Sequence, residues 1–141
     1  MSVGLIRGLC LSYPHATEQM QWGDDLVFKI GGKIFAVTPL GPQHGLVLSV
    51  KTSDERFYEL TEVAGIVPAP YMARNKWIAL ERWDALRRSE IEELVRESYA
   101  LVFAKLPKKK QAELSAASSP KSLSKKRPRK IAKKAKAGRG R

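Results

Sequence analysis

Hydrophobic and polar positions follow a β-type pattern most clearly in the first half of the chain. Two β-rich runs, Leu26–Ile30 and Lys33–Thr38, flank the dipeptide Gly31-Gly32. Two adjacent glycines accept the positive φ angles of a tight primed turn, so this pattern predicts a β-hairpin. A further alternating run at 45–51 puts its larger apolar side chains on one face and predicts a third antiparallel strand.

The N-terminal segment has the spacing of a short helix. Residues 3–10 predict a helix whose inward residues are Leu5, Ile6 and Leu9. Pro14 ends this helix, because the residue before a proline disfavours the helical region. Residues 17–22 are compatible with a short edge strand.

The middle of the chain combines a helix, a loop and a strand. Ser53 is a good N-cap, and the apolar spacing that follows it predicts a second helix, which Gly65 stops. The prolines of segment 68–70 predict a rigid extended loop, and the apolar run at 75–80 predicts a fourth strand.

A last helix is predicted to begin at Asp84 or Ser89 and to end at Pro107. One continuous apolar stripe runs along it: Ile91, Leu94, Val95, Ser98, Tyr99, Val102, Phe103 and Leu106. The element order α-β-β-β-α-β-α predicts an α+β fold, in which a small antiparallel sheet has its helices packed on one face.

Charge is distributed very unevenly along the chain. The sequence holds 26 basic and 14 acidic residues. The stretch from residue 107 to residue 141 carries 14 of the basic residues and one of the acidic ones, Glu113. Residues 1–106 are therefore close to neutral, with 12 basic and 13 acidic residues. A block of like charge beside a near-neutral body usually serves as an interaction tail.

The C-terminal stretch also has the composition of a disordered segment. It contains no aromatic residue, and Lys, Ala, Pro and Ser dominate it. Low hydrophobicity with high net charge does not offset the entropy lost on ordering. We therefore predict one globular domain over residues 1–107 and a disordered Lys/Arg-rich tail over residues 108–141.

The cations of this tail are candidates for contact with a polyanion, nucleic acid first. Each phosphate that Lys or Arg neutralises releases condensed counterions, so affinity is gained without sequence readout. A solubilising tail without a dedicated partner is the alternative, and segment 125–130 also fits a nuclear-import signal. The candidate nucleic-acid-binding residues of the tail are Lys108, Lys109, Lys110, Lys125, Lys126, Arg127, Arg129, Lys130, Lys133, Lys134, Lys136, Arg139 and Arg141.

Five further cations lie on or next to the predicted strands of the body. If the hairpin projects as a wing, its lysines could contact phosphate or enter a groove. The alternative is that these side chains solvate an exposed sheet face or protect an edge strand from aggregation. These five candidate residues are Lys29, Lys33, Lys51, Arg74 and Lys76.

No catalytic, metal or cofactor motif emerges, and the sequence predicts a protein that is not an enzyme. The histidines, His15 and His44, lie in different loops with no ligand spacing between them. The single cysteine, Cys10, excludes an internal disulfide and is expected to be a small buried hydrophobe. No export signal and no membrane span are predicted.

Four sequence blocks occur in an order that points to a known family. They are Tyr13–Val37, Leu48–Leu60, Ala69–Leu80 and Glu97–Lys109. In these blocks the chain resembles the MmcQ/YjbR family. The resemblance spans the body and excludes the tail. It implies a compact frataxin-like (CyaY-like) fold and a double-wing arrangement proposed to bind DNA, and it implies no enzymatic activity.

The implied frataxin-like fold raises the question of iron, because frataxins use a carboxylate-rich ridge. Four carboxylates cluster at the start of the last predicted helix: Glu90, Glu92, Glu93 and Glu97. Arginines lie among them, and acidic residues in a first turn suit the helix dipole, so a structural role is favoured.

The sequence as a whole predicts a bacterial nucleic-acid-binding protein with little sequence specificity. DNA is the expected partner and RNA the alternative; the oligomeric state is left open. The expected location is the cytoplasm, in association with the nucleoid. A second interpretation is a body that binds a small molecule or a protein near Trp77 and segment 68–71, with a tail that only localises it to polyanions.

Overall fold

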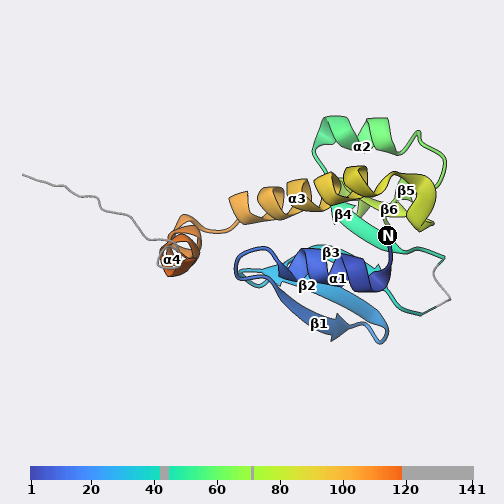
Figure 1. The fold of residues 1–141 in the computed structure, drawn as a ribbon. Helices are drawn as coiled ribbons and strands as arrows, with labels where there is room; N and C mark the ends of the chain where they lie inside the picture. Colours follow the sequence, from blue (N-terminus) through green and yellow to red (C-terminus); the bar gives the residue numbers. More distant parts are fainter. Residues whose placement is uncertain (42–44, 71, 119–141) are drawn as a thin grey trace, which may run out of the picture. The chain divides into compact units, whose positions relative to one another are not determined.

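In the described part of the chain, six strands form one antiparallel sheet in the order β1-β2-β3-β4-β6-β5 (Figure 1). The computed structural model describes residues 1–41, 45–70 and 72–118. Each neighbouring pair of strands is antiparallel. The strands are β1 Thr17–Gln21, β2 Asp25–Ile30, β3 Lys33–Pro39, β4 Leu48–Lys51, β5 Ile66–Pro68 and β6 Trp77–Leu80.

The described residues also form four α-helices: α1 Val3–Leu11, α2 Asp54–Leu60, α3 Arg88–Ala104 and α4 Lys108–Ser118. Two single-turn 3₁₀ helices, η2 Ala73–Asn75 and η3 Trp83–Ala85, precede and follow β6. The chain divides into two units, Met1–Leu106 and Pro107–Arg141. The first unit contains the sheet with α1, α2 and α3, and the second contains α4. The α+β fold class predicted from the sequence is confirmed.

The predicted hairpin is confirmed as β2 and β3. Gly31 and Gly32 both have positive φ angles, 60° and 83°, as a primed turn requires. The register shifts by one residue between Phe28 and Lys29, so the hairpin contains a bulge. Gly31 also packs closely against the end of α3, since an added Cβ atom would lie 2.7 Å from Leu106 Cδ1.

The main core lies between the sheet and its helices. Helix α3 packs over β2, β3 and β4, while α2 contacts β5 and β6. The stripe predicted for the last helix is the buried one, at Ile91, Leu94, Val95, Ser98 and Val102. A second, smaller apolar cluster consists of Val27, Val37, Ala69, Trp77 and Ala79.

The predicted element order was incomplete for the sheet. Segment 66–68 pairs with β6 as β5, although Pro68 and Pro70 predicted only an extended loop at 68–70. Pro68 is tolerated here because β5 is an edge strand. Its outer side has no neighbouring strand among the described residues, so a missing backbone N–H there breaks no inter-strand hydrogen bond. Strand β6 begins at Trp77 and not at Asn75, because Lys76 adopts a left-handed conformation with φ 64°.

Two predictions about helices were wrong. In α1 the buried residues are Ile6 and Cys10, and Leu5 is exposed. Residues 108–118 were predicted to be disordered but form α4. Its sequence, KKKQAELSAAS, is rich in Ala, Lys, Gln, Glu and Leu, whose intrinsic helix propensity is high. Charge and hydropathy, on which the disorder prediction rested, do not measure that propensity. The remainder of the predicted tail lies outside the described residues.

Candidate nucleic-acid interface

The sheet topology brings the candidate cations of the body to one end of the sheet. Strands β2, β3, β4 and β6 are consecutive neighbours and run antiparallel. The end of β2, the start of β3, the end of β4 and the start of β6 therefore lie at the same end. Lys29, Lys33, Lys51 and Lys76 occupy these positions, and Arg74 lies in the 3₁₀ turn just before Lys76. We call this the hairpin-turn end of the sheet.

Lys51 joins the end of β4 to the segment before β6. Its ammonium donates a hydrogen bond to Asn75 O at 2.8 Å, between Arg74 and Lys76 in the sequence. The pKa of Lys51 is lowered, first by burial and then by the positive charge of Lys105, while Asp54 acts in the opposite direction. The field of Lys105 at Lys51 indicates that the C-terminus of α3 contributes positive charge to the hairpin-turn end.

Lys76 is held on the α2 side of this end. Its ammonium lies 5.4 Å from the ring centroid of Phe57 and 5.5 Å from that of Tyr58. Both distances are within the range of cation–π attraction. These rings position the charge without neutralising it.

Lys33 and Lys105 flank the contact between the hairpin turn and α3. Lys33 follows Gly31-Gly32 directly, and Lys105 precedes Leu106, which packs on Gly31. Both lysines are exposed. Lys105 was missed in the sequence analysis, although its position at the C-terminus of a predicted helix beside a basic tail could have suggested it.

Lys29 differs from the other candidates of the body. Its side chain is half-buried, and Nζ donates to Gln19 Oε1 of β1 at 2.9 Å. This hydrogen bond directs the ammonium across the sheet toward β1. Lys29 therefore bridges β2 and β1.

The cations of the body fall into two sets. Six arginines pair with carboxylates at N–O distances of 2.6 to 3.8 Å: Arg7, Arg56, Arg82, Arg87, Arg88 and Arg96. No ion pair to a described carboxylate is found for the other six cations: Lys29, Lys33, Lys51, Arg74, Lys76 and Lys105. All six lie at the hairpin-turn end. The body is near neutral in sum, yet its cations without an ion pair to a described carboxylate are gathered in one place, where Asp54 also acts on Lys51.

The same pairing accounts for the acidic cluster of α3. Glu90, Glu92, Glu93 and Glu97 each lie within 4.0 Å of an arginine nitrogen. Glu90 also accepts a hydrogen bond from the backbone N–H of Arg87 at 3.0 Å, which stabilises the helix start. Among the described residues, no group of three His, Cys, Asp or Glu side chains is placed to hold a metal ion.

Cys10 is buried in α1, as predicted. Burial raises the pKa of its thiol to about 12, so the thiol remains protonated in neutral solution. A buried, protonated thiol is a poor nucleophile. His15 is exposed with a φ angle of 62°, and His44 lies outside the described residues.

Trp77, beside which the alternative function would place a pocket, has a buried side chain. Trp77 is buried in the smaller apolar cluster together with Ala69, whose N–H donates to Trp77 O at 3.0 Å. Half-buried Met72 packs against the same cluster. Tyr71 lies outside the described residues.

The second unit contributes three exposed lysines in the first turn of α4: Lys108, Lys109 and Lys110. The N-terminus of a helix carries a positive partial charge, so cations there are not placed to stabilise the helix. The positive charge of these lysines therefore adds to the positive partial charge at the N-terminus of α4. The remaining candidate cations of the tail, from Lys125 to Arg141, lie outside the described residues.

The fold and the matching sequence define the class of protein. Residues 11–101 match the YjbR family, and the chain belongs to that family. The chain is similar to the crystal structure of DR2400 from Deinococcus radiodurans, which contains a DUF419 domain. That match has a TM-score of 0.72 and 28% identity, and covers 81% of this chain and 88% of the other.

A protein from Pseudomonas syringae has a similar fold, with a TM-score of 0.61 and 22% identity over 72% of this chain and 98% of the other. The comparison with curated proteins found no match. In the described part of the chain, no helix is long and apolar enough to cross a membrane.

Proposed function

We propose that this protein binds nucleic acid, DNA in the first place and RNA as the alternative, with little dependence on sequence. The observation that carries the proposal is the separation of the cations in the body. Six are compensated by carboxylates, and the six without an ion pair to a described carboxylate gather at the hairpin-turn end. Uncompensated cations gathered in one place are suited to phosphate contacts, which position a protein without reading sequence.

The Lys/Arg-rich tail would supply most of the affinity for nucleic acid. It holds 14 basic residues, against the six cations of the body that have no ion pair to a described carboxylate. Each neutralised phosphate of duplex DNA contributes about −0.9 to the slope of log K against log[salt]. If all six cations of the body met phosphates, their share would be a slope of about −5. Lys29 and Lys51 already donate to protein acceptors, so a smaller share is expected from the body.

The β2–β3 hairpin would act as one wing of the double-wing arrangement proposed for this family. Its exposed contact residue would be Lys33, next to the Gly31-Gly32 turn. Lys51, Arg74, Lys76 and Lys105 would line the adjoining surface. The proposed function involves no catalytic step, no metal and no cofactor. The proposed location is the cytoplasm, in association with the nucleoid.

A charge-matched pair of triple variants tests the role of the body in the full-length protein. The test variant replaces Lys33, Arg74 and Lys105 by Gln. These side chains are exposed and have no ion pair to a described carboxylate, so the fold is expected to be unaffected. The control replaces the same number of positive charges by Gln at Arg82, Arg87 and Arg88, which pair with carboxylates.

We expect the test variant to bind duplex DNA more weakly, with a salt slope shallower by up to about 3. The control should retain the slope of the unmodified protein, because its arginines lie away from the hairpin-turn end. Equal losses in the two variants would mean that only total charge matters. That outcome would refute a dedicated surface on the body.

A further inference from the structure

Strand β1 forms one edge of the sheet and has none of the features that usually protect an edge. It pairs with β2 over five residues without a register shift, and its other side has no partner strand among residues 1–41, 45–70 and 72–118. Natural edge strands are usually protected by lysine, proline, a bulge or very short length. Segment 17–21 contains neither lysine nor proline. The opposite edge is protected, since β5 has three residues and ends at Pro68.

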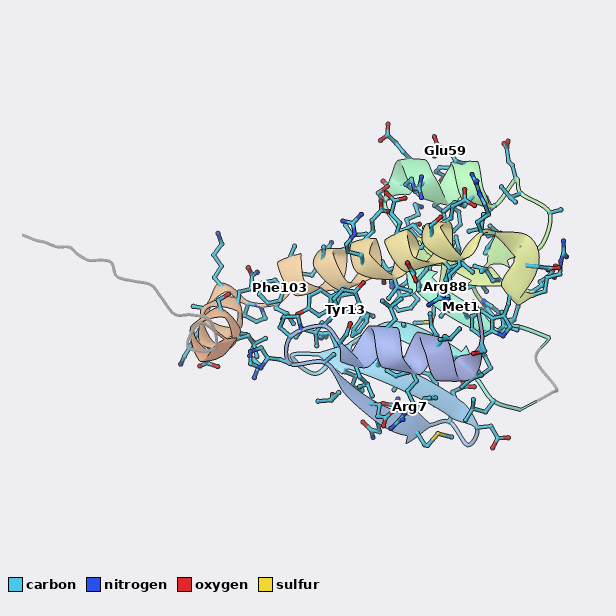
Figure 2. The ribbon with its side chains drawn as sticks, in the orientation of Figure 1. Met1, Arg7, Tyr13, Glu59, Arg88 and Phe103 are labelled. Carbon is cyan, nitrogen blue, oxygen red and sulfur yellow. The ribbon has the colours of Figure 1, made fainter. Side chains whose placement is uncertain are left out.

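The one charged side chain of β1 is already neutralised. Arg7 of α1 donates to both carboxylate oxygens of Glu18, at 2.7 and 2.6 Å. This hydrogen-bonded pair lowers the pKa of Glu18. Figure 2 shows Arg7 over β1. Glu18 therefore does not protect the edge as an unpaired charge would.

Exposed apolar side chains surround the C-terminal end of this edge. Met20 is 49% exposed, and Trp22, in the turn after β1, is 64% exposed. Leu40 is 46% exposed, and its N–H donates to Asp24 O in the same turn at 2.8 Å.

Val3 of α1 belongs to the same surface. The strand β1 points toward the end of the sheet at which α1 begins (Figure 1). Val3 precedes Arg7 by four residues, which is about 6 Å along the helix axis from the contact between Arg7 and Glu18. Met20 lies two strand residues away in the same direction, about 7 Å. Four of the seven large hydrophobic side chains exposed in the described part of the chain thus lie around β1: Val3, Met20, Trp22 and Leu40.

We propose that two copies of this chain pair through their β1 strands, in antiparallel orientation about a two-fold axis at Gln19. This pairing joins the two sheets into one continuous sheet. It supplies partners for the outward backbone groups of β1 and covers the apolar residues beside it. A second copy is the expected partner because β1 is complementary to itself. An isologous interface, in which both copies use the same surface, requires this property.

The sequence of β1 meets this requirement in the register centred on Gln19. Gln19 then faces its own copy. Its Oε1 already accepts from Lys29 Nζ at 2.9 Å, but a carbonyl oxygen has a second lone pair and the amide has two N–H donors, so the two Gln19 side chains can still exchange hydrogen bonds. Glu18 faces Met20 of the other copy, and Thr17 faces Gln21. No like charges meet in this register. A register centred on Glu18 would place two carboxylates opposite each other, which is unfavourable.

Pairing through β1 would also change binding to a polyanion. A dimer carries two basic arms, and joining two binding segments makes the second contact intramolecular. The dimer itself does not depend on the proposed nucleic-acid binding: of the candidate cations only Lys29 contacts β1, and it does so within one copy through Gln19.

Disulfide cross-linking of the full-length variant Gln19→Cys tests the proposal. Cross-strand neighbours have Cβ atoms about 4.5–5.5 Å apart, close to the separation that a disulfide needs. The only native cysteine is buried and protonated, so the introduced thiol reacts alone. We expect a covalent dimer under mild oxidation, and much less of it for Val63→Cys, an exposed position after α2. Equal cross-linking of both variants would overturn the proposal.

A second measurement does not depend on cysteine chemistry. Light scattering of the unmodified protein should give the mass of a dimer that dissociates on dilution. Met20→Glu should shift the protein to the monomer, because in this register the new carboxylate faces Glu18 of the other copy, and like charges directly opposite each other destabilise strand pairing. Val63→Glu adds the same charge at an exposed position elsewhere and should leave the dimer intact. A monomeric mass for the unmodified protein at every concentration would overturn the proposal and leave β1 as an edge for another partner.

Discussion

Replacing Ser98 by Ala should destabilise the body through two hydrogen bonds made by one hydroxyl group. Ser98 is fully buried in α3. Its Oγ donates to Phe35 O of β3 at 2.6 Å and accepts from the N–H of Lys51 in β4 at 3.0 Å. The hydroxyl therefore joins three elements where the sheet leads to the hairpin-turn end. Alanine would leave one backbone acceptor and one backbone donor without these partners.

The magnitude follows from the burial of the two backbone groups. A buried polar group that loses its partner costs about 1–3 kcal/mol. Phe35 is fully buried, while Lys51 is only partly buried, so water can replace part of its bond. We therefore expect a loss of about 2–4 kcal/mol in the free energy of unfolding. For a body of this size, that loss lowers Tm by roughly 10–25 °C.

Urea denaturation followed by tryptophan fluorescence measures this loss, because Trp77 is buried in the folded body. Ser89→Ala is the matched control, since Ser89 is an exposed residue of the same helix and should change stability by less than about 0.5 kcal/mol. If Ser98→Ala were as stable as Ser89→Ala, the hydrogen bonds of Ser98 would not hold the three elements together.

Three further predictions concern single positions in the body. Gly31→Ala should lower the free energy of unfolding, measured in thermal melts, by about 2 kcal/mol or more, because its φ is 60° and the new Cβ would lie 2.7 Å from Leu106 Cδ1. Gly23→Ala is the control and should lose less stability, since Gly23 also has a positive φ but has open space around it. Cys10 should resist a thiol reagent at pH 8 in the folded protein and react in denaturant, since burial raises its pKa to about 12; equal rates in both states would contradict its burial. Tyr99→Phe should cost about 1 kcal/mol in urea titrations, because the Tyr99 hydroxyl donates to Pro14 O at 2.7 Å; an unchanged midpoint would mean that this bond contributes nothing.

Local patterns were sufficient to predict the hairpin, the fold class and the buried stripe of α3. Each depends on signals within one segment, such as the Gly31-Gly32 turn or apolar residues at helical spacing. Strand β5 could not be predicted in the same way. Three residues ending in a proline resemble a loop, and only their pairing with β6 makes them a strand. Tertiary pairing of this kind leaves no local signal.

The sequence predicted most residues of the candidate interface but not their arrangement in space. The sequence identified Lys33, Lys51, Arg74 and Lys76 as cations near strand ends. It could not indicate that six other cations, all arginines, would pair with carboxylates while these four would not, because pairs such as Arg7–Glu18 and Arg56–Glu97 join distant segments. The disorder predicted for residues 108–118 failed for a different reason, since helix propensity outweighed charge there.

Binding of duplex DNA across a salt titration tests the central claim most directly, with the full-length protein beside a truncation to residues 1–106. The truncation retains Leu106 and its contact with Gly31, so the body keeps its end intact. We predict a steep salt slope for the full-length protein and weaker binding with a shallow slope, no steeper than about −5, for the truncation. If neither protein bound duplex DNA or RNA at near-physiological salt, the proposed function would be contradicted.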